Sequence, residues 1–100
     1  MKKVFVEADA AAELSSSIEF YEEARLGLGI EFKTSVWKAI QVIQRQPDHY
    51  PLKSDGTRSL LMARFPFNIR YVELPETIWI VAIAHTSRRP NYWKDRLRNT

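Results

Sequence analysis

The positions of hydrophobic and polar residues in the first half of the chain predict one strand followed by two helices. Residues 3–7, Lys-Val-Phe-Val-Glu, are typical of a strand, and Asp9 after them is expected to cap a helix. Apolar residues then recur at helical spacing on either side of Gly27 and Gly29. The two stripes are Ala11, Leu14, Ile18 and Tyr21, then Phe32, Val36, Ile40 and Ile43. So short a glycine-containing link predicts an antiparallel helical hairpin that ends at Pro47.

The second half of the chain changes to the pattern of a sheet. Turn-forming residues fill 47–57, and three strand-like runs follow at 58–64, 67–74 and 77–84. The last run is apolar on both faces, so we expect it in the middle of the sheet. The order β-α-α-β-β-β predicts an α+β two-layer sandwich, in which a helical hairpin covers one face of a curved, mostly antiparallel sheet. We expect one domain over residues 1–100, with the other sheet face poorly covered.

Composition excludes several classes of site. The chain has no cysteine and no paired-histidine spacing, so we expect no metal site and no cofactor. No apolar run is long enough for a membrane span, and acidic residues follow too soon after Met1 for a signal peptide. We therefore expect a cytoplasmic protein that does not associate with membranes.

Charge is distributed unevenly along the chain. Residues 1–24 hold two lysines and six acids, whereas residues 85–100 hold five bases and one acid. The C-terminal segment therefore carries a net charge of +4, more than the +3 of the whole chain. Such a segment attracts a polyanion or an acidic protein, although it is also compatible with a role in solubility alone.

The same segment holds the densest group of candidate functional side chains. His85 offers an imidazole for proton transfer, Arg88 and Arg89 suit phosphate, and Tyr92 and Trp93 offer aromatic faces. Alternatively, the two aromatic residues cap the core while Arg88 or Arg96 pairs with Glu73 or Glu76. Ser15–Ser17 and the Glu22-Glu23 pair are interpreted as helix surface. Phe20 and Trp37 fall beside the helix stripes, where they either complete the rim of the core or mark a groove for a partner.

Several motifs along the whole chain match one known family in order. They are Phe20-Tyr21-Glu22, Leu28-Gly29-x-x-Phe32, Pro47-x-x-Tyr50-Pro51, Phe65-Pro66-Phe67-x-Ile69-x-Tyr71 and, most specific, Ala82-Ile83-Ala84-His85-x-x-Arg88-Arg89-Pro90-x-Tyr92-Trp93-x-x-Arg96. The chain resembles the RelE/ParE superfamily of toxins from type II toxin–antitoxin modules, often labelled plasmid stabilisation proteins. The resemblance implies the same β-α-α-β-β-β fold and a toxin silenced by a cognate antitoxin.

The ParE-like branch of this superfamily, which we favour, inhibits DNA gyrase by binding. Under that interpretation Arg88, Arg89 and Arg96 contact the target, and Tyr92 and Trp93 either anchor the segment or insert into the target. A third interpretation is a family member that has lost toxicity and only binds its partner.

The RelE-like branch is the enzymatic alternative. Its members cut messenger RNA on the ribosome without a metal, and His85, Arg88, Arg89 and Tyr92 would form a reduced catalytic set here. The positions that supply lysines and an arginine in that branch correspond to Leu60, Met62 and Asn68. Unless Arg64 or Arg70 substitutes, cations needed for phosphate cleavage are missing, which favours the gyrase branch.

Both branches imply the same antitoxin. It is expected to be ParD-like, with an acidic toxin-binding region that is disordered when alone. We expect it to lay an amphipathic helix over the helical hairpin near Phe20 and Trp37.

Overall fold

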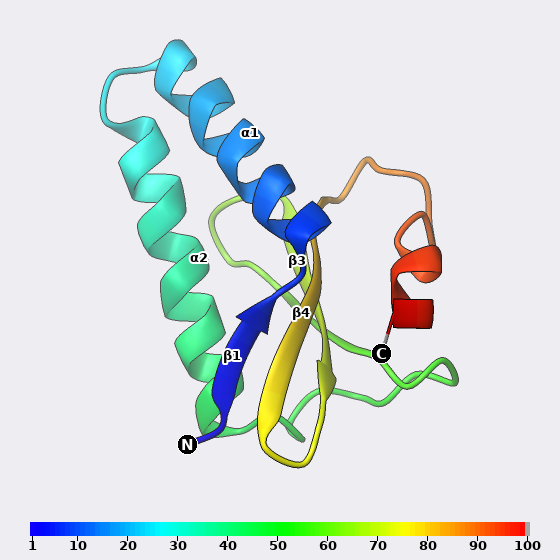
Figure 1. Cartoon of the computed structure of the whole chain (residues 1–100). Helices are drawn as coiled ribbons and strands as arrows, with labels where there is room; N and C mark the ends of the chain where they lie inside the picture. Colours follow the sequence, from blue (N-terminus) through cyan, green and yellow to red (C-terminus); the bar gives the residue numbers. More distant parts are fainter. Residues whose placement is uncertain (100) are drawn as a thin grey trace.

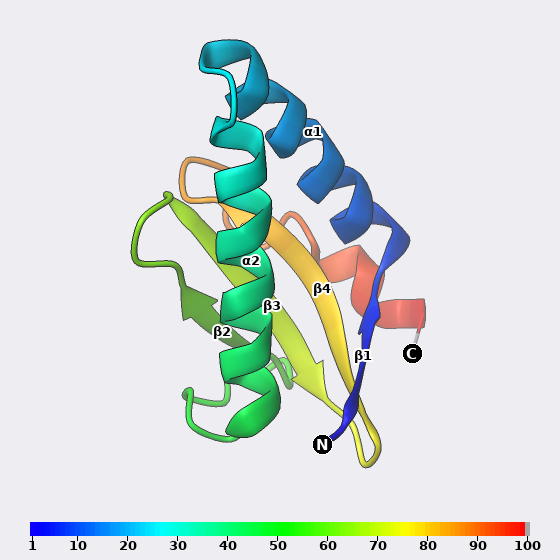
Figure 2. The ribbon, with the colours of Figure 1, turned by 90° about the vertical axis from the view of Figure 1, so that its left-hand side faces the viewer.

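The sheet lies between the helical hairpin on one side and the C-terminal segment on the other (Figures 1 and 2). The computed structural model of the chain describes residues 1–99, with side chains through Arg98, so Thr100 of the predicted basic segment lies outside the described residues. The elements are β1 (Lys3–Val6), α1 (Ala8–Ala24), α2 (Leu28–Arg45), β2 (Arg58–Leu61), β3 (Phe67–Glu73), β4 (Thr77–His85) and a 3-10 helix, η1 (Lys94–Asn99). The predicted order and the α+β class are confirmed. None of the described helices is both long enough and apolar enough to cross a membrane.

The sheet has the strand order β1-β4-β3-β2. β1 pairs in parallel with β4, whereas β3 pairs in antiparallel with both β4 and β2. As predicted, β4 lies inside the sheet, and residues 78–83 are all buried. A bulge between Arg70 and Tyr71 shifts the register of β3 against β4.

Each face of the sheet has its own apolar cluster. Ile78, Ile80 and Ile83 pack on the helix side against the stripe of α2, whose four predicted residues are all buried. On the opposite face, Trp79 and Val81 pack against Trp93 of the C-terminal segment. The expectation of a poorly covered second face was therefore wrong. Exposing the rings of Trp79 and Trp93 to water would be costly, and residues 86–98 fold back so that both rings are buried.

The helical hairpin is closed by Glu22. Its two carboxylate oxygens accept hydrogen bonds from the backbone N–H groups of Gly27 (2.8 Å) and Gly29 (2.9 Å), at the N-terminus of α2. Gly27 adopts a left-handed conformation with φ of 89°, which glycine tolerates without strain. Glu22 is thus not the solvated surface residue that its place beside Glu23 suggested, because the first free amides of a helix attract a carboxylate.

α1 begins earlier than the sequence indicated. The N–H of Glu7 still pairs with the Ile80 carbonyl at the end of β1, and the Glu7 carbonyl already accepts from Ala11 in the first helical turn. Glu7 is therefore the N-cap residue, and Asp9 lies inside the first turn. With this start Ala10 faces the core, and Ala11 is exposed.

β2 is also shorter than the predicted run 58–64. The chain turns after Leu61 so that Phe65 enters the core, where its ring lies 5.0 Å from the ring centres of both Tyr21 and Phe32. Phe67 joins the same cluster at 4.8 Å from Phe32. These rings fix the part of the hairpin that holds Tyr21 and Phe32 on the sheet.

The contact between the two helices predicts the effect of Gly29→Ala. A Cβ at this position would lie 2.7 Å from the backbone carbonyl oxygen of Ile18, so α1 and α2 must separate. We expect overpacking to outweigh the better helix propensity of alanine and to lower the free energy of unfolding by about 1–2 kcal/mol. Urea unfolding, with Thr34→Ala on the exposed face of α2 as control, measures this. A Gly29→Ala variant as stable as the parent would contradict a tight helix contact.

Candidate binding site

His85 of the C-terminal segment ends β4, and the rest of its described part, residues 86–99, leaves the sheet and turns back across its second face. The turn is held by hydrogen bonds from the Thr86 N–H to the Pro66 carbonyl (2.8 Å) and from the Arg88 N–H to the His85 carbonyl (3.0 Å). Asn91 takes a left-handed conformation with φ of 65°, and η1 begins three residues later. Trp93 anchors the segment: it is 5% exposed, and the guanidinium of Arg70 lies 4.3 Å from its ring centre.

The carboxylate of Glu13, on α1, joins three parts of the fold. It accepts two hydrogen bonds from the guanidinium of Arg96 (3.0 Å each), one from the Tyr92 hydroxyl (2.5 Å) and one from the backbone N–H of Ile83 (3.1 Å). Arg96 also donates to the Val81 carbonyl at 2.9 Å. The side chains of Glu13 and Arg96 are each only 14% exposed. Two-bond pairing of this kind is among the stronger ion-pair geometries, so the segment is held by specific contacts as well as by burial.

Through these contacts Tyr92 and Arg96 stabilise the folded position of the C-terminal segment. Burial, together with the hydrogen bond to the negatively charged Glu13, raises the pKa of Tyr92 well above its usual value. The guanidinium of Arg96 lies 5.2 Å from the ring centre of Tyr92 and also approaches the Asp9 carboxylate at 3.6 Å. The expected partners of the arginines, Glu73 and Glu76, are not used: Glu73 pairs with Lys2 instead. The structure thus gives Tyr92, Trp93 and Arg96 the anchoring contacts that the sequence left as one of two possibilities.

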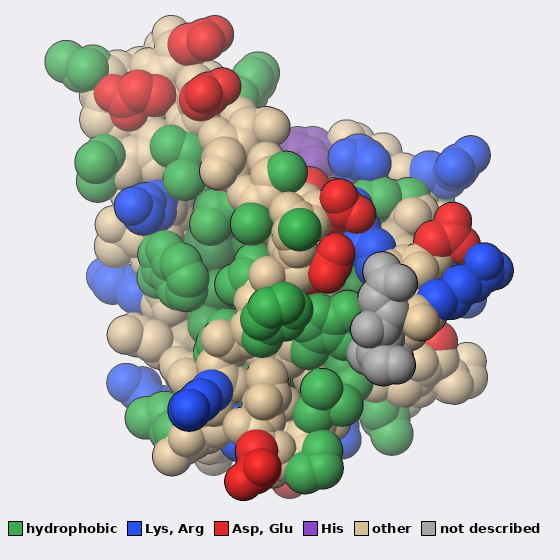
Figure 3. Space-filling view, in the orientation of Figure 1, with side chains coloured by type: hydrophobic (Ala, Val, Ile, Leu, Met, Phe, Trp, Pro, Cys, Tyr) green, Lys and Arg blue, Asp and Glu red, His purple; other side chains and the backbone are tan. Residues whose placement is uncertain are grey.

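Arg88 and Arg89 remain exposed on the turn that these contacts hold. The guanidinium of Arg88 lies 3.9 Å from the ring centre of Tyr92 and is 51% exposed. The side chain of Arg89 makes no hydrogen bond or ion pair to any residue in the described chain. In the space-filling view, Lys and Arg side chains gather on the side of the molecule that the C-terminal segment forms (Figure 3).

A hollow of about 230 Å³, here called the basic hollow, lies between the turn and the ends of β3 and β4. Its charged and polar lining includes Asn68, Arg70, His85, Arg88 and Arg89. Arg70 is held there by a 2.9 Å hydrogen bond from its guanidinium to the Thr57 hydroxyl. Such a concentration of donors suits an anionic group. In the described part of the chain no cluster of three or more His, Asp or Glu side chains is arranged to hold a metal ion.

The imidazole of His85 is held in one orientation. Its Nδ1 accepts the backbone N–H of Ser87 at 3.0 Å, so the neutral ring carries its proton on Nε2. A ring in this state has no free lone pair with which to remove a proton from a substrate. The arrangement is unsuited to a general base.

The remaining positions of the enzymatic interpretation are divided between core and surface. Leu60 and Met62 are each only 7% exposed and belong to the core, whereas Asn68 and Arg70 line the basic hollow. Arg64 lies elsewhere, in an ion pair with Glu31. Of the two arginines considered as substitutes, only Arg70 reaches the site.

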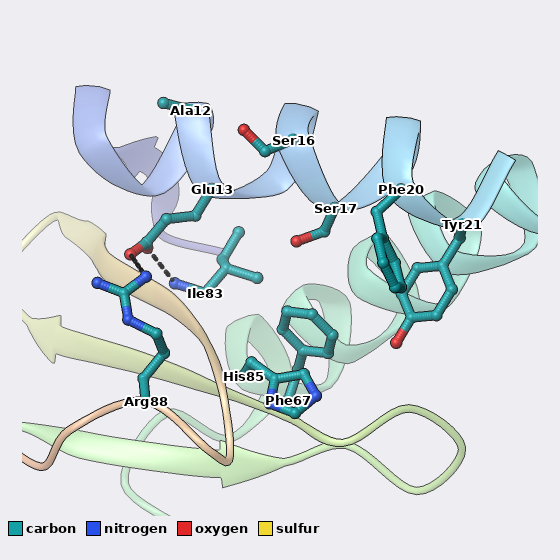
Figure 4. A pocket seen from close by; sticks show the side chains of 10 residues that line it. All are labelled: Ala12, Glu13, Ser16, Ser17, Phe20, Tyr21, Phe67, Ile83, His85 and Arg88. Carbon is teal, nitrogen blue, oxygen red and sulfur yellow. Dashed lines mark hydrogen bonds and ion pairs between the residues drawn. The ribbon is translucent and has the colours of Figure 1, made fainter. Parts of the chain in front are cut away.

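A larger hollow of about 560 Å³ lies between α1 and the end of β4 (Figure 4). We call it the Phe20 hollow; it is lined by Ala12, Glu13, Ser16, Ser17, Phe20, Tyr21, Phe67, Ile83, His85 and Arg88. Phe20 is 67% exposed at its edge. Trp37, on α2, is 41% exposed and does not line this hollow, so only Phe20 of the two predicted groove residues lines it.

The role of Glu13 was not predicted from the sequence, and Arg70 was considered there only as a substitute cation. Glu13 was one of several acids beside the apolar stripe of α1, and nothing in its spacing distinguishes it from Glu19. Its partners lie 70 to 83 residues away along the chain.

A scan against protein-family models and a search of curated proteins each found no match to the sequence. Among solved structures, the chain is similar to a chain of the chromosomal ParDE TA system from P. aeruginosa. The TM-score is 0.75 at 19% sequence identity, and the match covers 85% of this chain and 96% of that chain. The fold that the resemblance implied is thereby confirmed, since a chain of a ParDE TA system has the same fold.

The Glu13 network predicts a large loss of stability in Glu13→Ala. This change leaves the partly buried guanidinium of Arg96 without its two-bond partner, and we expect the free energy of unfolding to fall by about 2–4 kcal/mol. Asp95→Ala is the matched control, because the Asp95–Arg98 pair is almost fully exposed and should change stability by less than about 0.5 kcal/mol. Equal losses in the two variants, measured by urea unfolding, would contradict the role given to Glu13.

The raised pKa of Tyr92 predicts a dependence of stability on alkaline pH. Because the folded protein holds this proton more tightly than the unfolded chain does, the stabilisation is complete below about pH 10 and is lost as the pH rises above it. The free energy of unfolding, measured in urea, should therefore fall less in Tyr92→Phe than in the parent between about pH 8 and about pH 11. Tyr71, whose pKa burial raises to about 12, contributes the same background to both proteins. Parallel pH profiles would contradict this assignment.

Proposed function

We propose that the protein is the toxin component of a type II toxin–antitoxin module, acting in the cytoplasm by ParE-like binding to DNA gyrase. The observation that carries the proposal is the anchored C-terminal turn, which presents Arg88 and Arg89 on a fold similar to a chain of a ParDE TA system. An inhibitor that acts by binding needs a rigid recognition surface rather than a catalytic pair. Trp93 and the Glu13–Arg96 pair fix the chain that follows the turn. The hydrogen bond from the Thr86 N–H to the Pro66 carbonyl fixes the chain that precedes it.

In this proposal Arg88 and Arg89 make the principal contacts with the gyrase–DNA complex. Both guanidinium groups retain donors for phosphate or carboxylate oxygens, and the basic hollow, which both arginines line, accepts one such group. Tyr92, Trp93 and Arg96 contribute by holding the turn in place. The expected effect is a stabilised cleaved gyrase–DNA complex and a block of replication.

The geometry gives less support to a ribosome-dependent endonuclease. His85 lacks a free acceptor nitrogen, the hydroxyl of Tyr92 is bound to Glu13, and two positions that would need cations lie in the core as Leu60 and Met62. If the parent protein, with Leu60 and Met62 in place, cleaves messenger RNA and the His85→Gln variant does not, the enzymatic branch is favoured instead. A protein without effect on gyrase or message would be a non-toxic binding partner.

The proposal includes a cognate, ParD-like antitoxin with an acidic toxin-binding region. Exposed apolar side chains for such a partner occur on both helices, with Phe20 on α1 and Ile30 and Trp37 on α2. Hydrophobic side chains are also visible in the space-filling view between the hairpin and β1 (Figure 3). An amphipathic helix of the antitoxin can bury these residues, and the basic segment attracts its acids.

The proposal predicts that Arg88→Ala combined with Arg89→Ala abolishes most of the gyrase inhibition. Loss of two charged contacts should raise the concentration needed to inhibit supercoiling by about tenfold or more, because neither arginine is required by the fold. Lys33→Ala combined with Lys38→Ala on α2 removes the same charge away from the site and should change little.

Antitoxin-free protein is to be assayed in parallel for gyrase supercoiling and cleavage and for cuts in a translated message. Trapped cleaved DNA with an intact message supports the gyrase proposal. Cuts in the message with unaffected gyrase would overturn it.

A further inference from the structure

The Phe20 hollow and the basic hollow share two side chains, His85 and Arg88. In the close-up, the rings of Phe20 and Tyr21 lie at one end of the Phe20 hollow and that of Phe67 lies nearer its middle, whereas Arg88 lies at the other end near Glu13 (Figure 4). The hydroxyl-bearing side chains of Ser16 and Ser17 lie on α1 between them. The hollow is therefore apolar at one end and cationic at the other.

The charge of Arg88 is poorly compensated within the described chain. Its one acidic neighbour there is Glu13, at 4.0 Å, which is beyond hydrogen-bond distance. That carboxylate already accepts Arg96, Tyr92 and the Ile83 amide. A guanidinium has five N–H donors, so Arg88 is able to take a second carboxylate without giving up its position over the Tyr92 ring.

We propose that the Phe20 hollow binds an apolar side chain of an acidic peptide segment, whose neighbouring carboxylate pairs with Arg88. The rings bury the apolar group, and the poorly compensated cation at the other end selects an acid over a neutral or basic residue. Since Arg88 also lines the basic hollow, a segment bound in this way removes it from any other anionic partner. This last step rests on the proposed function: the peptide and the toxin target compete for one arginine, so neutralisation needs no change of fold.

The binding is tested on the intact protein with the capped dipeptide N-acetyl-Phe-Glu-amide as the probe. Two-dimensional NMR spectra follow the amide signals during titration up to about 50 mM, because so small a ligand is expected to bind in the millimolar range. We expect saturable shifts at Ser17, Phe20 and Arg88. The Phe-Gln dipeptide should bind about two- to fivefold more weakly, since it lacks the charge. Absence of saturable shifts at these residues, or equal affinity for the two dipeptides, overturns the proposal.

Matched variants assign the preference to Arg88. Arg88→Gln should remove the preference for Glu over Gln, whereas Arg89→Gln, at an arginine that lines only the basic hollow, should keep it. Phe20→Ala should weaken both dipeptides about fivefold or more, whereas Ile30→Ala, at an equally exposed residue on α2, should weaken neither. A preference that survives Arg88→Gln places the carboxylate elsewhere and overturns the proposal.

The same probe separates this proposal from the proposed function. If the protein inhibits gyrase, saturating Phe-Glu dipeptide should raise the inhibitory concentration of the parent protein, and the Phe-Gln dipeptide should do so less. Inhibition that is unchanged by bound dipeptide overturns the competition. A protein that binds the dipeptide through Arg88 but leaves gyrase unaffected overturns only the proposed target.

Discussion

The position of the C-terminal segment on the sheet depends on the hydrogen bonds that the carboxylate of Glu13 accepts. The side chain of Glu13 is only 14% exposed, and burying a carboxylate is costly unless its oxygens accept hydrogen bonds; here four donors supply them. These donors come from β4 and from the C-terminal segment, while Glu13 itself belongs to α1. One side chain therefore fixes the helix layer, the central strand and the covering segment relative to one another.

This arrangement explains how a short polar turn presents two arginines in a defined position. Arg88 and Arg89 lie between His85, at the end of the central strand, and Tyr92, which is bound to Glu13. Because the turn is already ordered, less conformational entropy is lost when a partner binds, which favours affinity at a small surface. The basic hollow on one side and the Phe20 hollow on the other give this turn two neighbouring surfaces of different chemistry.

The periodic features of the fold could be predicted from the sequence, because they depend on local spacing. The stripe of α2, the hairpin and the interior position of β4 all follow from the spacing of apolar residues. The covered second face did not follow, since Trp79 and Trp93 meet only in three dimensions. Likewise, Glu13 and Glu22 have the same local pattern as exposed acids, and only their distant or main-chain partners distinguish them. The candidate residues of the segment were found, but their division into anchors and exposed arginines required the packing.

The most direct test of this account is the backbone mobility of residues 86–98, measured by nitrogen-15 NMR relaxation in the parent protein and in Glu13→Ala. In the parent the segment should be as rigid as β4, with order parameters near about 0.85. In the variant the segment should become mobile while α2 and the sheet remain rigid. A segment that is already mobile in the parent, or that stays rigid without Glu13, would contradict the central role of this carboxylate.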